Sequence, residues 1–276
     1  MKTAIMAGNG SVCWGYGLDL WFKYGIKVGI DLPINSHCHA ILSGASGSGK
    51  STALLYLLGR LLQANSNPGI CLYICDFKNS DDFRFLKGHE HYYTADDVYD
   101  GVMNYYAAFT NARENMENNN LPRYCLIIDE YPALISHLQM QDKINKTKKA
   151  NDILNVISQI LMLGRGVANG FGLWLVMQRP DSTFLPNGAR DNFMVSLGLG
   201  FLSPEGRRML FPSMDIPDKT LKIGEGWLLA DGHDIKAVKY PLISNLDVWK
   251  ENIRRELTRM ERPPQRASHE SNGDTA

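Results

Sequence analysis

The sequence predicts an α/β protein in which a mostly parallel β-sheet carries helices on both faces. Three observations predict this class. Short, continuously apolar segments of strand length recur along the chain, segments of helical periodicity lie between them, and a glycine-rich turn joins the first such strand to the first such helix. Continuous apolar strands that alternate with helices are typical of parallel sheets covered on both faces.

Composition limits the architecture and the kinds of partner. The chain has 276 residues, of which 44% are apolar and 21% are charged, and this is enough to bury one substantial core. The formal net charge is zero, so the overall charge does not indicate a nucleic-acid partner, and any basic surface must be local.

The cysteines and the apolar runs indicate the compartment. The five cysteines are an odd number, most of them lie in apolar stretches, and no signal peptide precedes them, which predicts a reduced, cytoplasmic protein. The apolar runs are far shorter than the ~18–20 residues that a membrane span needs, so we expect no intrinsic membrane segment.

The chain divides into three parts. Residues 1–36 hold short β-prone segments between glycines and are expected to form a β-rich lead-in. Residues 37–262 form the expected core domain, and the Pro-, Ser- and charge-rich tail 263–276 is expected to be disordered. The elements expected within the core are, in order, strand 38–43, helix 50–63, strand 70–75, strand 124–128, helix 152–163, strand 172–177 and strand 194–199.

Local signals predict three further elements. Thr94 opens a sequence with capping-box spacing and predicts a helix that runs to about Met116. Ser203, followed by a proline, predicts the cap of a short helix. Residues 227–230 and 235–240 predict a hairpin around an Asp-Gly turn.

A phosphate-binding loop is predicted between the first strand and the first helix. Its sequence fits G-x-x-x-x-G-K-[ST], in which glycines let backbone N–H groups converge on phosphate oxygens. We expect Lys50 to reach the β- and γ-phosphates of ATP and the Ser51 hydroxyl to bind Mg²⁺. A glycine-rich turn without a ligand has no need of this Gly-Lys-Ser ending. The expected nucleotide-binding residues are Gly44, Ala45, Ser46, Gly47, Ser48, Gly49, Lys50, Ser51 and Thr52.

Two carboxylates follow the apolar strand over 124–128. Asp129 is placed to hold Mg²⁺, directly or through water, and Glu130 is placed to polarise the attacking water as a general base. The alternative is an ordinary strand-to-helix junction with a capping Asp and a first-turn Glu. The phosphate loop about 80 residues upstream favours the catalytic interpretation.

Polar residues also end two other strands. Gln178 ends the strand over 172–177, where an amide can touch the γ-phosphate or orient water, although the residues alone favour an ordinary strand end that enters a turn. Asp76 and Lys78 end the second strand, at the edge where such sheets place active-site groups, and we expect them to support the site.

Several segments together resemble the FtsK/SpoIIIE motors of the HerA–FtsK group of P-loop ATPases. The segments are His39–Gly44 running into the phosphate loop, Tyr73–Lys78, Leu121–Glu130 and Gly164–Pro180. The Gln-Arg-Pro ending of the last segment is the most discriminating, because many ATPases share the Walker motifs. Met177 and Trp174 replace the family's usual Thr and His, and both substitutions preserve a buried strand.

The resemblance implies a RecA-like P-loop NTPase core, a homo-hexameric ring, and ATP-driven movement of double-stranded DNA without sequence specificity. It implies a metal role for Asp129, a base role for Glu130 and a sensor role for Gln178. An arginine from a neighbouring subunit would complete the site, although a surface salt bridge is an equal alternative for each candidate. The candidates are Arg165, Arg179 and Arg190.

The size of this motor unit indicates the biological process in which the protein acts. With no membrane segment and no basic winged-helix module, the sequence resembles the FtsK-like proteins of conjugative transposons, plasmids and phages. That implies DNA transfer or mobilisation, with a relaxase or a membrane transfer protein as partner. The alternatives are an FtsK-like ATPase that powers protein secretion, disfavoured by the single phosphate loop, and a P-loop kinase, disfavoured because Glu130 and Gln178 suit attack by water.

A dense lysine run follows the acidic pair. Its lysines are Lys143, Lys146, Lys148 and Lys149. We hypothesise that they approach DNA phosphates, which need no base readout. The alternative, a solvated basic loop before the helix over 152–163, is favoured by the residues alone.

Overall fold

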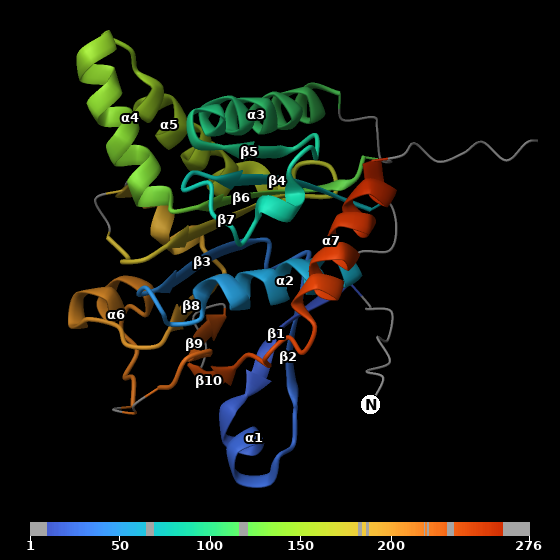
Figure 1. Ribbon diagram of the computed structural model, residues 1–276. Coiled ribbons are helices and arrows are strands. Elements are labelled where there is room, and N and C mark those ends of the chain that lie inside the picture. Colours follow the sequence, from blue (N-terminus) through green and yellow to red (C-terminus); the bar gives the residue numbers. More distant parts are fainter. Residues whose placement is uncertain are drawn as a thin grey trace, which may run out of the picture.

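The computed structural model describes residues 10–64, 69–115, 121–181, 184–185, 188–217, 219, 221–230 and 235–261. One ten-stranded sheet runs through the molecule in the order β2-β1-β10-β9-β8-β3-β7-β6-β4-β5 (Figure 1). The predicted α/β class is confirmed.

Six strands form the parallel part of the sheet. β3 pairs with β7 on one side and β8 on the other, and the parallel pairing continues through β6 and β4 to β5. The bounds are β3 (His39–Gly44), β4 (Ile70–Asp76), β5 (Tyr92–Thr94), β6 (Arg123–Asp129), β7 (Phe171–Met177) and β8 (Val195–Leu199). The predicted strands lie within one or two residues of these bounds, because each is a continuous apolar run that fills a doubly covered sheet.

Helices cover both faces of the parallel part. Alternate strand residues, such as Leu42 and Val176, pack with α2 (Lys50–Ala64) and α7 (Leu246–Glu261), the two helices in front of the sheet in Figure 1. The other face packs against three helices. They are α3 (Val98–Glu114), α4 (Tyr131–Asn145) and α5 (Lys149–Leu163), of which α4 and α5 project together at the upper left of Figure 1.

Antiparallel strands extend the sheet beyond β8. β9 (Glu225–Ala230) and β10 (Lys236–Lys239) pair as the predicted hairpin, and the turn at Asp231 lies outside the described residues. β1 (Ser11–Gly17) and β2 (Gly29–Pro33) follow in the same sheet. α1 (Leu18–Tyr24) joins them and projects at the lower end of the molecule (Figure 1).

The remaining helical segments are short. The predicted cap of α6 (Pro204–Leu210) is confirmed, because the Ser203 hydroxyl accepts a hydrogen bond from the Gly206 N–H at 3.1 Å. The 3₁₀ turns are η1 (Arg84–Leu86), η2 (Ala95–Asp97), η3 (Gly164–Gly166) and η5 (Ala189–Asn192).

Two local predictions are wrong. Thr94 makes no side-chain cap hydrogen bond; it ends β5, and the chain passes through η2 before α3 begins at Val98. The helix predicted from residue 152 begins at Lys149, because the Asp142 carboxylate of α4 accepts hydrogen bonds from the Lys149 and Ala150 N–H groups at 2.9 Å each. A side chain from the preceding helix therefore caps α5.

The tail 263–276 lies outside the described residues. Within the described ranges, no helix combines the length and the apolar character that crossing a membrane requires.

Candidate nucleotide site

The phosphate loop joins the carboxyl end of β3 to the amino end of α2. Gly47 and Gly49 have φ of +80° and +92°, a region that favours glycine, and this lets the chain turn tightly into the helix. The first N–H groups of α2 have no acceptor within the helix and carry the positive end of its dipole. Ala45, Ser46 and Gly47 are exposed, so solvent reaches the outside of the loop.

A contact from the antiparallel part of the sheet fixes the loop. The Gly224 N–H donates to the Ser48 carbonyl at 2.9 Å. A Cβ on Gly49 would lie 2.9 Å from the Gly224 nitrogen, and a Cβ on Gly44 would lie 2.4 Å from Ser48 Oγ. The turn before β9 therefore supports the phosphate loop from outside, and a side chain at Gly49 would displace the backbone of that turn.

The acidic pair lies at the end of β6, on the same edge of the sheet. Glu130 is in the left-handed region, with φ 56° and ψ 40°, and its side chain does not cap α4. Instead Glu130 Oε1 accepts hydrogen bonds from Lys50 Nζ and Gln178 Nε2, each at 3.0 Å. The geometry brings these three predicted site residues together, and the alternative of an ordinary helix-capping junction does not describe Glu130.

Asp129 is buried beside this group. Burial raises the pKa of the Asp129 carboxyl to about 6, and the nearby charge of Lys50 opposes the shift while the negative charges of Glu130 and Asp76 add to it. Three buried oxygens here have no hydrogen-bond partner among the described residues: Asp129 Oδ1, Asp76 Oδ1 and Ser48 Oγ.

These oxygens fit Mg²⁺. Mg²⁺ prefers oxygen ligands, usually one or two carboxylates with phosphate oxygens and water, and a buried carboxylate oxygen without a partner is costly unless a ligand satisfies it. Asp129 would hold the cation, and Ser51 lies in the first turn of α2, where its hydroxyl can share that role.

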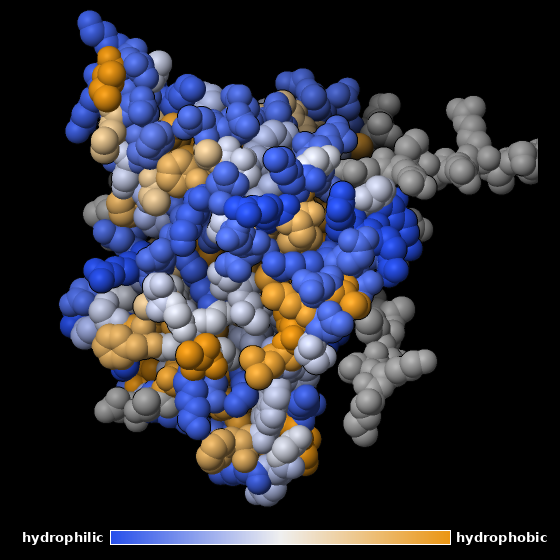
Figure 2. All heavy atoms as spheres, in the orientation of Figure 1, coloured by the Kyte–Doolittle hydropathy of each residue, from blue (hydrophilic) through white to orange (hydrophobic). Residues whose placement is uncertain are grey.

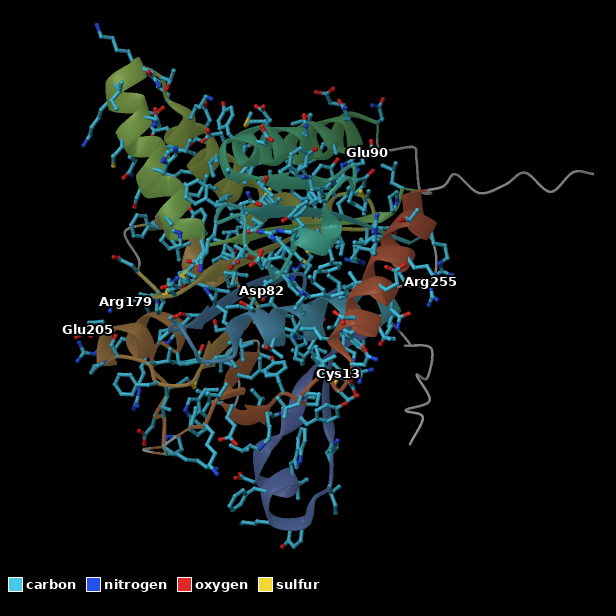
Figure 3. All side chains as sticks on the ribbon, in the orientation of Figure 1. Cys13, Asp82, Glu90, Arg179, Glu205 and Arg255 are labelled. Carbon is cyan, nitrogen blue, oxygen red and sulfur yellow. The ribbon has the colours of Figure 1, made fainter. Side chains whose placement is uncertain are left out.

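The three predicted arginines lie at two opposite edges of the parallel sheet. Arg179 directly follows β7 at the phosphate-loop edge, and Figure 3 shows it on the same side of the molecule as Glu205 of α6. Arg165 lies in η3, and its charge helps to lower the pKa of His39 at the amino end of β3. Arg190 lies in η5, which leads into the amino end of β8. Arg165 and Arg190 are thus separated from their own phosphate loop by the length of β3, about 17 Å at a rise of ~3.3 Å per residue.

The sequence placed Asp76 at the active-site edge of the sheet but did not predict that it lies next to Asp129. Asp76 pairs with Asp129 in the parallel register of β4 and β6, and its side chain is fully buried. An apolar strand that ends in a single Asp is the signal that points to it.

A relative with curated annotation shows which proteins this sequence resembles. The chain is 28% identical over 191 residues to the FtsK domain-containing protein YdcQ of Bacillus subtilis, and this covers 64% of the chain. The chain resembles FtsK-domain proteins. The match covers 37% of the length of YdcQ, and no family model matches the chain.

Solved structures of a conjugation coupling protein and of secretion ATPases share the fold. The conjugation coupling protein TcpA of pCW3, as a monomer with ATPγS, has a TM-score of 0.63 at 21% identity, over 87% of this chain and 68% of that one. The cytoplasmic domain of the type VII secretion ATPase EccC of Thermomonospora curvata has a TM-score of 0.64 at 20% identity, over 94% and 33%. ATPases 2 and 3 of EssC from Geobacillus thermodenitrificans give 0.66 at 15% identity, over 92% and 49%. At these identities the likeness shows the P-loop NTPase fold.

Proposed function

We propose that the chain is an ATP hydrolase of the FtsK/SpoIIIE type that moves double-stranded DNA in the transfer or mobilisation of a genetic element. The observation that carries the proposal is the position of Glu130, held at 3.0 Å by both Lys50 and Gln178. A carboxylate that lies beside a phosphate loop suits activation of water for attack on the terminal phosphate. The similarity to YdcQ supports the FtsK type.

The contacts of Glu130 suggest how binding prepares the reaction. The α2 N–H groups and Lys50 bind the phosphates, and these phosphates compete with Glu130 Oε1 for the Lys50 ammonium. Glu130 is then free to accept a proton from the attacking water, while the Gln178 amide orients that water. Mg²⁺ held by Asp129 and Ser51 would neutralise charge on the β- and γ-phosphate oxygens.

A homo-hexameric ring in the cytoplasm is part of the proposal. Arg165 and Arg190 lie at the edge of the sheet opposite to their own phosphate loop, so either can act only on the nucleotide of a neighbouring copy. Arg179 lies at the phosphate-loop edge of its own subunit. A relaxase or a membrane transfer protein is the kind of partner that this role requires.

The helical projection formed by α4 and α5 is the proposed DNA contact. The lysine run spans its tip, from Lys143 at the end of α4, through Lys146 and Lys148 in the turn, to Lys149 at the start of α5. The Asp142 carboxylate accepts hydrogen bonds from the Thr147 hydroxyl and from the first N–H groups of α5. These hydrogen bonds fix the tip. Figure 2 shows a largely hydrophilic surface on this projection, interrupted by an apolar group. Lysines on a rigid projection suit contact with phosphates.

ATP hydrolysis with and without long duplex DNA tests the proposal. We expect duplex DNA to stimulate the rate, and Lys50→Ala to abolish it. FtsK-like secretion ATPases are the second candidate, because EccC and EssC match the fold as well as TcpA does. Stimulation by a peptide substrate and none by DNA would overturn the DNA proposal in favour of secretion. The absence of any hydrolysis would overturn both.

Charge reversal at the tip of the projection tests the DNA contact. Changing Lys143, Lys146, Lys148 and Lys149 to Glu should remove stimulation by DNA and leave the basal rate unchanged. Lys23→Glu with Lys87→Glu is the matched control, since both lysines are exposed and lie on other elements. Normal stimulation of the first variant would show that the tip is only a solvated basic surface.

A further inference from the structure

Asp76 lies beside Asp129 at the end of the sheet. The two residues are register partners in the parallel pairing of β4 and β6. Neighbouring strands lie about 4.8 Å apart and paired residues project from the same face, so the two carboxylates are adjacent. Asp76 has no exposed surface and Asp129 is 8% exposed, so neither carboxylate is solvated by bulk water.

The two oxygens of Asp76 have different surroundings. Oδ2 accepts from the Ser80 N–H at 2.8 Å, the Ser80 hydroxyl at 3.3 Å and the Tyr92 hydroxyl at 3.1 Å. Oδ1 is buried and accepts no hydrogen bond from the part of the chain that the structure describes. The carboxylate is therefore anchored through one oxygen, and the other is left for a donor from outside the chain.

The turn after β4 does not explain this arrangement. A single acceptor oxygen is enough for the hydrogen bonds that Ser80 and Tyr92 donate, and the side-chain carbonyl of an asparagine would supply that oxygen without a charge. A buried charged oxygen without a hydrogen-bond partner costs more free energy than a buried neutral oxygen, and a second carboxylate next to it adds repulsion. A cation with its bound water removes both penalties at once.

We propose that Asp76 is a positioning residue of the Mg²⁺ site, and that its Oδ1 accepts a hydrogen bond from a water of the cation's hydration shell. The inference rests on the proposed function, which supplies the cation. Mg²⁺ gives up its water reluctantly and keeps several water ligands in protein sites. Asp129 would then hold the cation as a ligand, and Asp76 would hold one of the waters bound to the cation.

Asp76→Asn isolates the role of Oδ1. The asparagine carbonyl can still accept from Ser80 and Tyr92, and its NH₂ group then replaces Oδ1, so the anchor is kept and the acceptor is lost. We expect the affinity for Mn²⁺, measured by electron paramagnetic resonance on the protein with a non-hydrolysable ATP analogue, to fall about 10- to 100-fold. The affinity for the analogue in excess EDTA should be unchanged. Asp76→Glu, which keeps the charge but moves the oxygens, should also weaken Mn²⁺ binding.

Tyr92→Phe is the matched control. It removes a donor to Oδ2 and leaves both carboxylates in place, so we expect a lower melting temperature with Mn²⁺ affinity close to that of the wild type. Equal loss of Mn²⁺ affinity in Tyr92→Phe and Asp76→Asn would mean that the strand end had merely shifted, and would overturn the inference. If Asp76→Asn binds Mn²⁺ as tightly as the wild type, the inference about Asp76 is overturned and the proposed function stands. If the wild-type protein binds no nucleotide, the proposed function is overturned as well.

Discussion

The Lys50 ammonium lies 3.0 Å from Glu130 Oε1, in a pair whose side chains are only 10% and 13% exposed. Lys50, which should bind the terminal phosphate, is thus paired with Glu130, which should accept the proton from water. In the proposed mechanism, a bound phosphate draws Lys50 away from Glu130, so readiness for hydrolysis depends on the presence of the nucleotide.

Glu130→Gln should separate binding from hydrolysis. The glutamine carbonyl can still accept from Lys50, so the loop keeps its geometry and nucleotide affinity should remain near that of the wild type. The amide cannot accept a proton, and we expect the hydrolysis rate to fall by about 10²- to 10⁴-fold. A direct titration and a phosphate-release assay measure the two quantities. A variant that hydrolyses ATP at the wild-type rate would exclude Glu130 as the base.

Gly49→Ala should disrupt the phosphate loop. A Cβ there would lie 2.9 Å from the Gly224 nitrogen, and the φ of +92° is strained for alanine, so stability should fall by at least about 1–3 kcal/mol. Gly25→Ala is the control, because its φ of +67° imposes a similar strain but its Cβ would have no atom within 4 Å. Thermal unfolding measures the stability of both variants. Nucleotide titration should show lost binding for Gly49→Ala alone. Equal effects from both variants would show that the Gly224 contact is unimportant.

Asp129→Asn should stabilise the protein when no metal is present. The Asp129 carboxyl has a folded pKa of about 6, above its unfolded value, so the folded chain binds the proton more tightly and stability falls as pH rises from about 4 to 6. Above that window the charged carboxylate lowers the unfolding free energy by up to about 3 kcal/mol. Chemical unfolding in EDTA should find the variant more stable than wild type at pH 8, with a smaller difference at pH 5. A variant that is less stable at pH 8 would contradict this account.

His39 should destabilise the fold in acid. Its ring is fully buried, neither ring nitrogen has a hydrogen-bond partner in the described chain, and burial together with the charge of Arg165 lowers its pKa to about 4. The unfolded chain takes up this proton near pH 6.5 but the folded chain does not, so His39 lowers stability by up to about 3 kcal/mol as pH falls from 6.5 to 4.

His39→Leu removes this proton uptake. The advantage of the variant in unfolding free energy over wild type should grow between pH 7 and pH 4.5. The Asp129 and His39 effects have opposite slopes in this window, so each must be measured as a difference from wild type. A constant difference across the window would show that His39 does not titrate as its burial requires.

The sequence predicted the parallel strands and the phosphate loop because their signals are local. A continuous apolar run fills a covered strand wherever it lies, and the Gly-Lys-Ser ending of the loop carries its chemistry within a few residues. The contacts that organise the site are not local. Lys50 meets Glu130, 80 residues away in the chain, and Gly49 packs on Gly224, because of the order in which the strands assemble.

Two other features also depend on long-range packing. Asp142 caps α5 from the preceding helix, and this contact, rather than a capping motif in α5 itself, sets where the helix begins. The burial of Asp76 beside Asp129 follows from the pairing of β4 with β6, and strand neighbours cannot be deduced from the apolar pattern of either strand.

Binding of a non-hydrolysable ATP analogue with Mg²⁺ tests the central claim most directly. Calorimetric titration of the wild type should give saturable binding that weakens when Mg²⁺ is removed. Lys50→Ala should lose about 10- to 100-fold in affinity, because the charged donor to the phosphates is gone. A wild-type protein without affinity for the analogue, or a Lys50→Ala variant that binds it as tightly as wild type, would contradict the account.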